Sequence, residues 1–159
     1  MKKKLKLGFF SFTSCEGCVM VVLNSFNSKF NELSEFIELK YCIPLLEKNV
    51  IQEMDAAFIE GAIARPSDLE KLKKIRENAK KLIVLGGCAA TGWPSTQRNF
   101  FSEETKKEIS GTVKRLGQLE KISLAKDFVK VDEALNGCPI ELKAFEDLME
   151  KLLKEFQIK

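Results

Sequence analysis

Cysteine is the residue type whose spacing in this chain is most informative about chemistry. Cys15 and Cys18 lie three positions apart directly after an apolar run, and Cys88 and Cys138 follow later in the sequence. Each of these four has a glycine within two residues. The fifth cysteine, Cys42, lies outside this pattern in an apolar segment, where a thiol commonly serves as a small buried hydrophobe.

Four patterned thiols in a chain without histidine limit the kinds of site that can form. Tetrahedral zinc and an iron–sulfur cluster are both held by four thiolates. Structural zinc usually takes two short cysteine pairs, whereas here one pair is short and the other two cysteines are single. Cys138 is followed by Pro139, as at many cluster ligands. The spacing therefore favours a cluster, with zinc, thioredoxin-like redox chemistry and plain buried thiols left open.

Alternating strand and helix signals indicate which elements position the cysteines. Apolar or alternating runs predict strands over 5–12, 36–42, 56–60, 82–85 and 128–131. Helices are predicted over 19–30, 67–79 and 139–156, the second of them capped by Ser67. The last helix has a predicted apolar face made of Leu142, Phe145, Leu148, Met149, Leu152 and Leu153. From 91 to 119 we expect a loop and one or two short polar helices.

This order of elements predicts an α/β fold, a flavodoxin-like doubly wound parallel sheet that forms a single domain over residues 1–159. The short pair of cysteines follows the first predicted strand, Cys88 follows the fourth and Cys138 follows the fifth. Loops after parallel strands emerge at one edge of the sheet, where ligands bind in such folds. We therefore expect the four thiols to converge at the carboxyl edge, with the neighbouring glycines allowing close approach of the backbone.

Composition and charge exclude several classes of protein. The 26 basic and 23 acidic residues nearly balance, so the strong positive charge of a nucleic-acid-binding protein is missing. We expect no signal peptide and no membrane insertion, because the apolar runs are short. A cytoplasmic location follows as an expectation, and in that reducing compartment clustered cysteines more often bind metal or do redox chemistry than form disulfides.

Four motifs, in order along nearly the whole chain, resemble those of a known family. They are Ser14-Cys15-Glu16-Gly17-Cys18, the 58–63 segment, Gly86-Gly87-Cys88-Ala89 and Gly137-Cys138-Pro139. Together they resemble the small subunit of cytoplasmic NiFe hydrogenases, of the NAD-reducing and sulfhydrogenase delta type. The related 20 kDa subunit of respiratory complex I is similar too, but it has adjacent cysteines where this chain has the spaced pair.

The resemblance implies a role in electron transfer. In that family a single flavodoxin-like domain holds one 4Fe-4S cluster through the positions that match Cys15, Cys18, Cys88 and Cys138. The implied partners are a NiFe hydrogenase large subunit, which carries the catalytic metals, and downstream diaphorase or other iron–sulfur or flavin subunits. FMN is a weaker cofactor expectation, because no phosphate loop follows the first strand. A zinc-stabilised interaction domain and an FMN-binding flavodoxin-like module remain the alternatives.

Two further expectations concern individual side chains. Glu60 ends the third predicted strand, so its carboxylate should point toward the carboxyl edge, where it would relay protons; the competing interpretation is that it fixes the turn at 61–62 through backbone hydrogen bonds. Trp93, Phe100 and Phe101 are expected either to form an exposed partner interface or to pack together under a loop.

Overall fold

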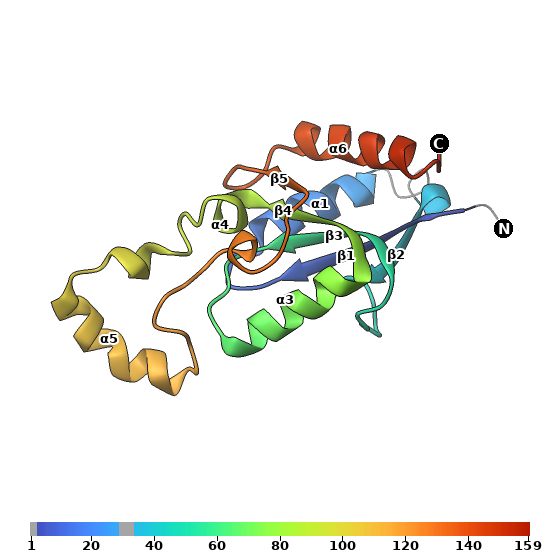
Figure 1. The fold of residues 1–159 in the computed structure, drawn as a ribbon. Helices are drawn as coiled ribbons and strands as arrows, with labels where there is room; N and C mark the ends of the chain where they lie inside the picture. The colour runs from blue at the N-terminus through green and yellow to red at the C-terminus, as the bar shows by residue number, and fades with distance from the viewer. Residues whose placement is uncertain (1–2, 29–33) are drawn as a thin grey trace.

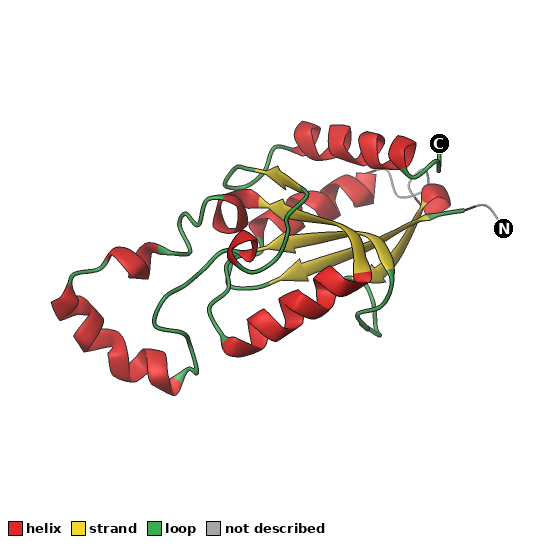
Figure 2. Cartoon of the chain, in the orientation of Figure 1, coloured by secondary structure: helices red, strands yellow, loops and turns green. Residues whose placement is uncertain are grey.

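The computed structural model describes residues 3–28 and 34–159. Within this part of the chain, five strands form one parallel sheet in the order β2-β1-β3-β4-β5 (Figures 1 and 2). The strands are β1 (Leu5–Ser11), β2 (Ile37–Tyr41), β3 (Met54–Glu60), β4 (Ala79–Leu85) and β5 (Glu133–Leu135). The helices are α1 (Gly17–Ser28), α3 (Pro66–Asn78), α4 (Gly86–Ala90), α5 (Glu103–Arg115) and α6 (Leu142–Glu155), with short 3-10 helices η1 (Gln97–Phe100) and η2 (Ala125–Asp127). The predicted flavodoxin-like α/β fold is confirmed.

The sheet has a hydrophobic core on each face, because successive side chains along a strand point in opposite directions. Phe9 packs with Phe58 and Phe145 on the face covered by α1 and α6. Its neighbour Phe10 packs with Tyr41 on the other face, which α3 covers (Figure 1). Burial on both faces explains why the central strands read as continuous apolar runs.

The predicted apolar face of the last helix is largely confirmed. Phe145, Leu148, Met149, Leu152 and Leu153 are buried against the sheet. Leu142, which was also assigned to this face, is exposed because it is the first residue of α6. The helix was predicted to begin at residue 139, so α6 begins three residues later than the sequence predicts. The predicted end of the first helix, at residue 30, lies outside the described residues.

The fifth strand is not where the sequence predicts it. The prediction of a strand at 128–131 is wrong. Phe128 and Val129 donate their backbone N–H groups to the Ala125 carbonyl and so close the η2 turn. Pairing with β4 begins only after Asp132, whose backbone N–H donates to the Leu82 carbonyl at 2.8 Å. The edge strand β5 is consequently three residues long and begins at residue 133.

The start of α3 also differs from the prediction. The helix begins at Pro66, so Ser67 lies inside its first turn and does not cap it. Asp68, also in the first turn, instead fixes the chain that enters the helix, because its carboxylate accepts the backbone N–H groups of Ala64 and Arg65 at 3.1 and 3.0 Å. Proline at the first helical position is compatible with this arrangement, since that N–H has no partner within a helix.

Residues 93–124 form an arm that extends beyond the carboxyl ends of the strands (Figure 1). It contains η1 and α5, in agreement with the predicted loop and short polar helices. Two side chains close the arm at its base. The guanidinium of Arg98 donates to the Leu119 carbonyl, and Asn99 exchanges hydrogen bonds with the backbone of Ile122 at 2.7 and 2.9 Å. In the described part of the chain, no helix combines the length and apolarity needed to cross a bilayer.

Candidate metal centre

The four patterned cysteines all lie at the carboxyl edge of the sheet. Cys15 follows β1 and Cys18 is in the first turn of α1, while Cys88 lies in α4 directly after β4 and Cys138 follows β5. Cys18 is buried, Cys88 is half-buried, and the other two are exposed. The topology therefore brings these residues to one edge, as the sequence predicts, and leaves part of the group open to the surface.

The turn between β4 and α4 packs directly against Cys18. Gly86 adopts a φ of +82°, and a Cβ at this position would lie 2.4 Å from the Cys18 sulfur. Both the backbone conformation and the lack of space require glycine here. This close approach carries the half-buried Cys88, two residues along, into the neighbourhood of the spaced pair.

The loop that holds Cys138 is fastened to both of the other cysteine segments. The backbone N–H of Gly87 donates to the Gly137 carbonyl at 2.7 Å. The backbone N–H of Ile140 donates to the Cys18 sulfur. Peptide N–H groups that point at a ligand sulfur stabilise its thiolate form, and in metal sites such contacts tune the centre. Three loops that are distant in sequence are thus held together by their backbones.

Electrostatics at this edge favour a positively charged occupant. The pKa of Cys18 is raised to about 11, chiefly by burial and also by the neighbouring Glu60, Cys15 and Cys88, against the Ile140 hydrogen bond that lowers it. The same contributions place Cys15 and Cys88 within electrostatic range of Cys18. A buried thiol of this kind ionises readily only beside a cation, and metal coordination is the usual cause of that ionisation.

Four thiols without a histidine form a donor set that both a single zinc ion and an iron–sulfur cluster use. Tetrahedral zinc with Zn–S bonds of about 2.3 Å would bring its sulfurs to roughly 3.8 Å from one another. Across residues 3–28 and 34–159, no three histidine, cysteine or carboxylate side chains lie close enough together to hold a single metal ion.

Glu60 anchors the segment that carries the spaced pair of cysteines. Its carboxylate is buried and accepts the backbone N–H groups of Cys18 at 3.3 Å and Val19 at 2.8 Å, and it is also hydrogen-bonded to Ser14. Burial raises the pKa of Glu60 in spite of these hydrogen bonds. No acidic residue is present in the first turn of α1, so Glu60 supplies the negative charge that a helix N-terminus favours.

Sequence reasoning located this glutamate at the edge but missed what it holds. The competing interpretation had Glu60 accept hydrogen bonds at the 61–62 turn, whereas its carboxylate accepts the backbone N–H groups of Cys18 and Val19 in α1. The signal that could have revealed it is the absence of a capping side chain directly before α1, which leaves the first N–H groups of the helix in need of an acceptor. Gly86 was noted as a neighbour of a cysteine, but its contact with Cys18 appears only in the fold.

The three aromatic side chains of the arm are exposed. Phe100 is 79% exposed, Trp93 61% and Phe101 39%. The Trp93 carbonyl lies 2.7 Å from where a Cβ of Gly87 would stand, so this part of the arm packs on the α4 turn. The exposure of these aromatic side chains agrees with a partner interface and not with aromatic residues packed together beneath a loop.

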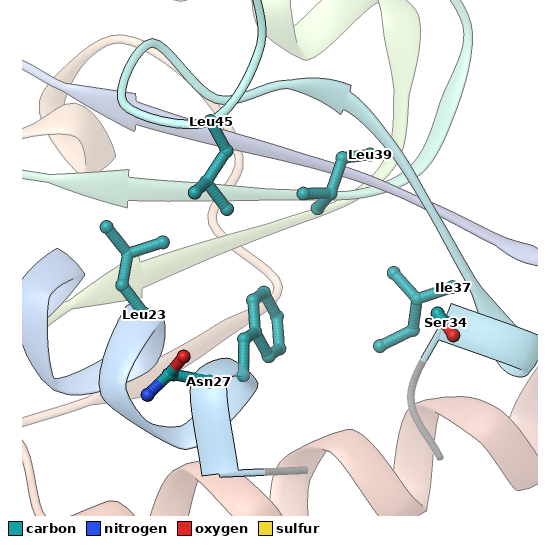
Figure 3. A pocket seen from close by; sticks show the side chains of 7 residues that line it. Leu23, Asn27, Ser34, Ile37, Leu39 and Leu45 are labelled. Atoms are coloured by element: carbon teal, nitrogen blue, oxygen red, sulfur yellow. The ribbon is translucent and has the colours of Figure 1, made fainter. Parts of the chain in front are cut away.

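The fifth cysteine and an apolar cavity lie apart from this centre. Cys42 is fully buried directly after β2, as expected of a small core hydrophobe. A cavity of about 410 Å³ opens between α1, β2 and the segment after β2 (Figure 3). It is lined by Leu23, Phe26, Asn27, Ser34, Ile37, Leu39 and Leu45. None of these residues is a candidate ligand, so the cavity does not belong to the cysteine centre.

Comparison with known sequences identifies a matching family and several relatives. A family model described as the 20 Kd subunit of NADH ubiquinone oxidoreductase matches residues 15–152. The delta subunit of sulfhydrogenase 2 from Pyrococcus furiosus is 33% identical over 138 residues, which cover 86% of this chain and 57% of the relative. The gamma subunit of coenzyme F420 hydrogenase from Methanosarcina barkeri is 28% identical, over 87% of this chain and 50% of the relative. The chain thus spans about half the length of the curated relatives it matches.

Solved structures share the fold. A chain of an NAD⁺-reducing NiFe hydrogenase in the H2-reduced state superposes with a TM-score of 0.81 at 24% identity, covering 96% of this chain and 93% of that one. A chain of the Ni-Fe-Se hydrogenase from Desulfomicrobium baculatum gives a TM-score of 0.66 at 15% identity, covering 93% of this chain and 61% of that one. At these identities the likeness establishes a common fold.

Proposed function

Because the chain belongs to the family of the 20 Kd subunit of NADH ubiquinone oxidoreductase, we propose that it is an electron-transfer subunit of a NiFe hydrogenase. The observation that carries the proposal is the meeting of four cysteines from three loops at one edge of the sheet. The names of the relatives, several of which are hydrogenase subunits, support this class of complex over other members of the family.

Cys15, Cys18, Cys88 and Cys138 are the proposed ligands of one 4Fe-4S cluster. A bound cluster would supply one-electron transfer and no bond chemistry on a substrate. The chain's own residues provide the site. Glycine at 86 leaves room for the Cys18 sulfur, and the Ile140 N–H donates to it. The resulting domain, residues 1–159 with one cluster, would depend on a partner chain for catalysis.

The partner in this proposal is the large subunit that carries nickel and iron. Exposure of Cys15 and Cys138 leaves this side of the edge open, and the exposed Trp93 belongs to the part of the arm that packs on the α4 turn. A partner that covered this surface would exclude water and shorten the path for electrons. Diaphorase or other iron–sulfur or flavin subunits would be the further partners, in a cytoplasmic complex.

Zinc and FMN are the alternatives that the experiment must separate. The loop after β1, where a flavodoxin-like protein would bind a phosphate, here carries Cys15 and Glu16, and the Glu60 carboxylate accepts the N–H groups of Cys18 and Val19 at the start of α1. Acidic side chains at this position disfavour a phosphate group. The presence of one short cysteine pair and two single cysteines likewise disfavours a structural zinc ion, which usually takes two short pairs.

Anaerobic purification of the chain with iron, sulfide, zinc and flavin analysis tests the cofactor. We expect about four irons and four sulfides per chain, a brown colour and a cluster signal in electron paramagnetic resonance after reduction. A colourless protein with one zinc, or a yellow protein with one flavin, would contradict the cluster. Purification of the native complex then tests the class of partner, because a nickel-containing chain should accompany this one.

A further inference from the structure

A second cavity lies on the arm, away from the cysteines. It measures about 270 Å³ and is formed where one stripe of α5 faces η1 and residues 118–120. Its lining residues are Arg98, Glu103, Lys106, Lys107, Ile109, Ser110, Val113, Lys114, Gln118 and Glu120. Four cations against two carboxylates give this cavity a positive charge.

Three of the four cations have no carboxylate partner. Lys106 forms an ion pair with Glu103 at 2.8 Å. Among the described residues, Arg98, Lys107 and Lys114 form no ion pair. Because this leaves three unpaired cations against the unpaired Glu120, an occupant with two negative charges would neutralise the cavity.

Arg98 is the residue most in need of a counter-ion. Its terminal nitrogens donate to the neutral side chain of Gln118 and to the Leu119 carbonyl, while its Nε is buried without a hydrogen-bond partner. Burial lowers the pKa of this guanidinium. A buried charge held only by neutral acceptors is stabilised when an anion binds nearby.

We propose that this cavity binds a phosphate group. A phosphate dianion matches the net charge, and its oxygens accept hydrogen bonds from lysine and arginine together. The cavity is larger than one phosphate and close to the lower end of ligand pockets, which is roughly 300 Å³. Both inorganic phosphate and the terminal phosphate of a small nucleotide therefore remain sources of the same chemistry. The inference does not depend on the proposed electron-transfer function.

Calorimetric titration of the full chain with inorganic phosphate and with ADP, in chloride buffer, tests the proposal. Lys107→Gln and Lys114→Gln should each weaken binding by about tenfold, the size expected for one charge-assisted hydrogen bond. The double variant should abolish measurable binding. Tighter binding of ADP than of phosphate would assign the site to a nucleotide, and equal binding would assign it to the free anion.

A charge-matched control separates the cavity from general attraction of anions. Lys73 and Lys74 are exposed on α3, so replacing both by glutamine removes the same charge elsewhere on the chain. This control should bind phosphate as the unaltered chain does, and circular dichroism should be the same for all variants. Binding that is absent at millimolar phosphate and ADP, or that falls equally in the two double variants, would overturn the proposal.

Discussion

At the scale of single residues, the four patterned cysteines and Cys42 differ in where the fold puts them. The patterned thiols lie in segments at the carboxyl edge of the sheet, whereas Cys42 is buried directly after β2. The proposed ligation predicts that replacing any one of Cys15, Cys18, Cys88 or Cys138 by serine removes most of the iron and sulfide, because a cluster held by three ligands is labile. Iron and sulfide analysis after anaerobic purification measures this.

Cys42→Ala is the matched control for this prediction. It removes a thiol of the same size from a site without neighbouring cysteines, so iron content should be unchanged while stability falls modestly through the lost packing. Loss of iron from Cys42→Ala together with retention in Cys138→Ser would show that the ligand set is wrong.

Glu60 gives a second prediction, because its two carboxylate oxygens accept from two different backbone N–H groups. Glutamine has a single acceptor oxygen, so Glu60→Gln would turn an amide donor toward one of those N–H groups. We expect a loss of about 1–3 kcal/mol in stability, measured by urea unfolding, as for an unsatisfied buried donor. Glu16→Gln, which alters an exposed carboxylate in the same loop, is the control and should change stability little.

The proton relay expected of Glu60 stays a prediction, and the same variant tests it in the complex. If the carboxyl group carries protons, Glu60→Gln should lower hydrogen turnover while iron content per complex is retained. If turnover per cluster is unchanged, the residue only positions the first turn of α1.

At the scale of elements, the attachment of the edge strand β5 depends on Asp132. Its carboxylate accepts the Leu82 N–H at 2.9 Å and the Arg76 guanidinium at 2.6 Å. Burial alone would raise the pKa of Asp132, but the hydrogen bonds from Leu82, Arg76 and Lys130 hold it below its usual value. Because the folded pKa is depressed, this stabilisation is present above pH about 4 and is lost as the pH falls through the folded pKa.

We therefore expect Asp132→Asn to cost about 1–3 kcal/mol of unfolding free energy at neutral pH, with the difference from the unaltered chain disappearing in acid. Urea unfolding at several pH values measures both effects. Asp147→Asn, which removes an exposed aspartate paired with Lys143 on α6, should have little effect at any of these pH values. A loss that persists unchanged in acid would mean that the Asp132 carboxylate is not the source of the stability.

The same strand marks the limit of what the sequence could predict. The central strands are long and apolar on both faces, so their positions follow from the hydrophobic pattern. The location of the cysteines at the carboxyl edge then follows from the parallel topology. β5 has three residues, too few for a periodicity, and the more apolar segment at 128–131 just before it ends a 3-10 turn instead. The contact of Gly86 with Cys18 joins residues that are distant in sequence, and no local pattern encodes it.

At the scale of the whole molecule, the chain has one candidate redox centre and spans about half the length of its curated relatives. The proposal therefore predicts that the chain expressed alone takes up no hydrogen with a viologen dye, since the reaction requires the partner's metals. Hydrogen uptake by the isolated chain, followed optically under anaerobic conditions, is the measurement. Sustained activity that copurifies with this chain alone would exclude a role as a relay subunit.

The exposed aromatics of the arm decide where a partner would bind. Phe100 is 79% exposed on the arm, and a large apolar side chain with that exposure marks a surface that a partner chain would cover. Phe100→Asp should weaken copurification of the large subunit by at least about tenfold, because a carboxylate would be buried in an apolar interface. Ile43→Asp alters a side chain that is 63% exposed near the end of β2, so it should leave assembly intact. If instead Ile43→Asp blocks assembly and Phe100→Asp does not, the partner covers the surface near the end of β2. The proposal that the arm forms the partner interface would then be wrong.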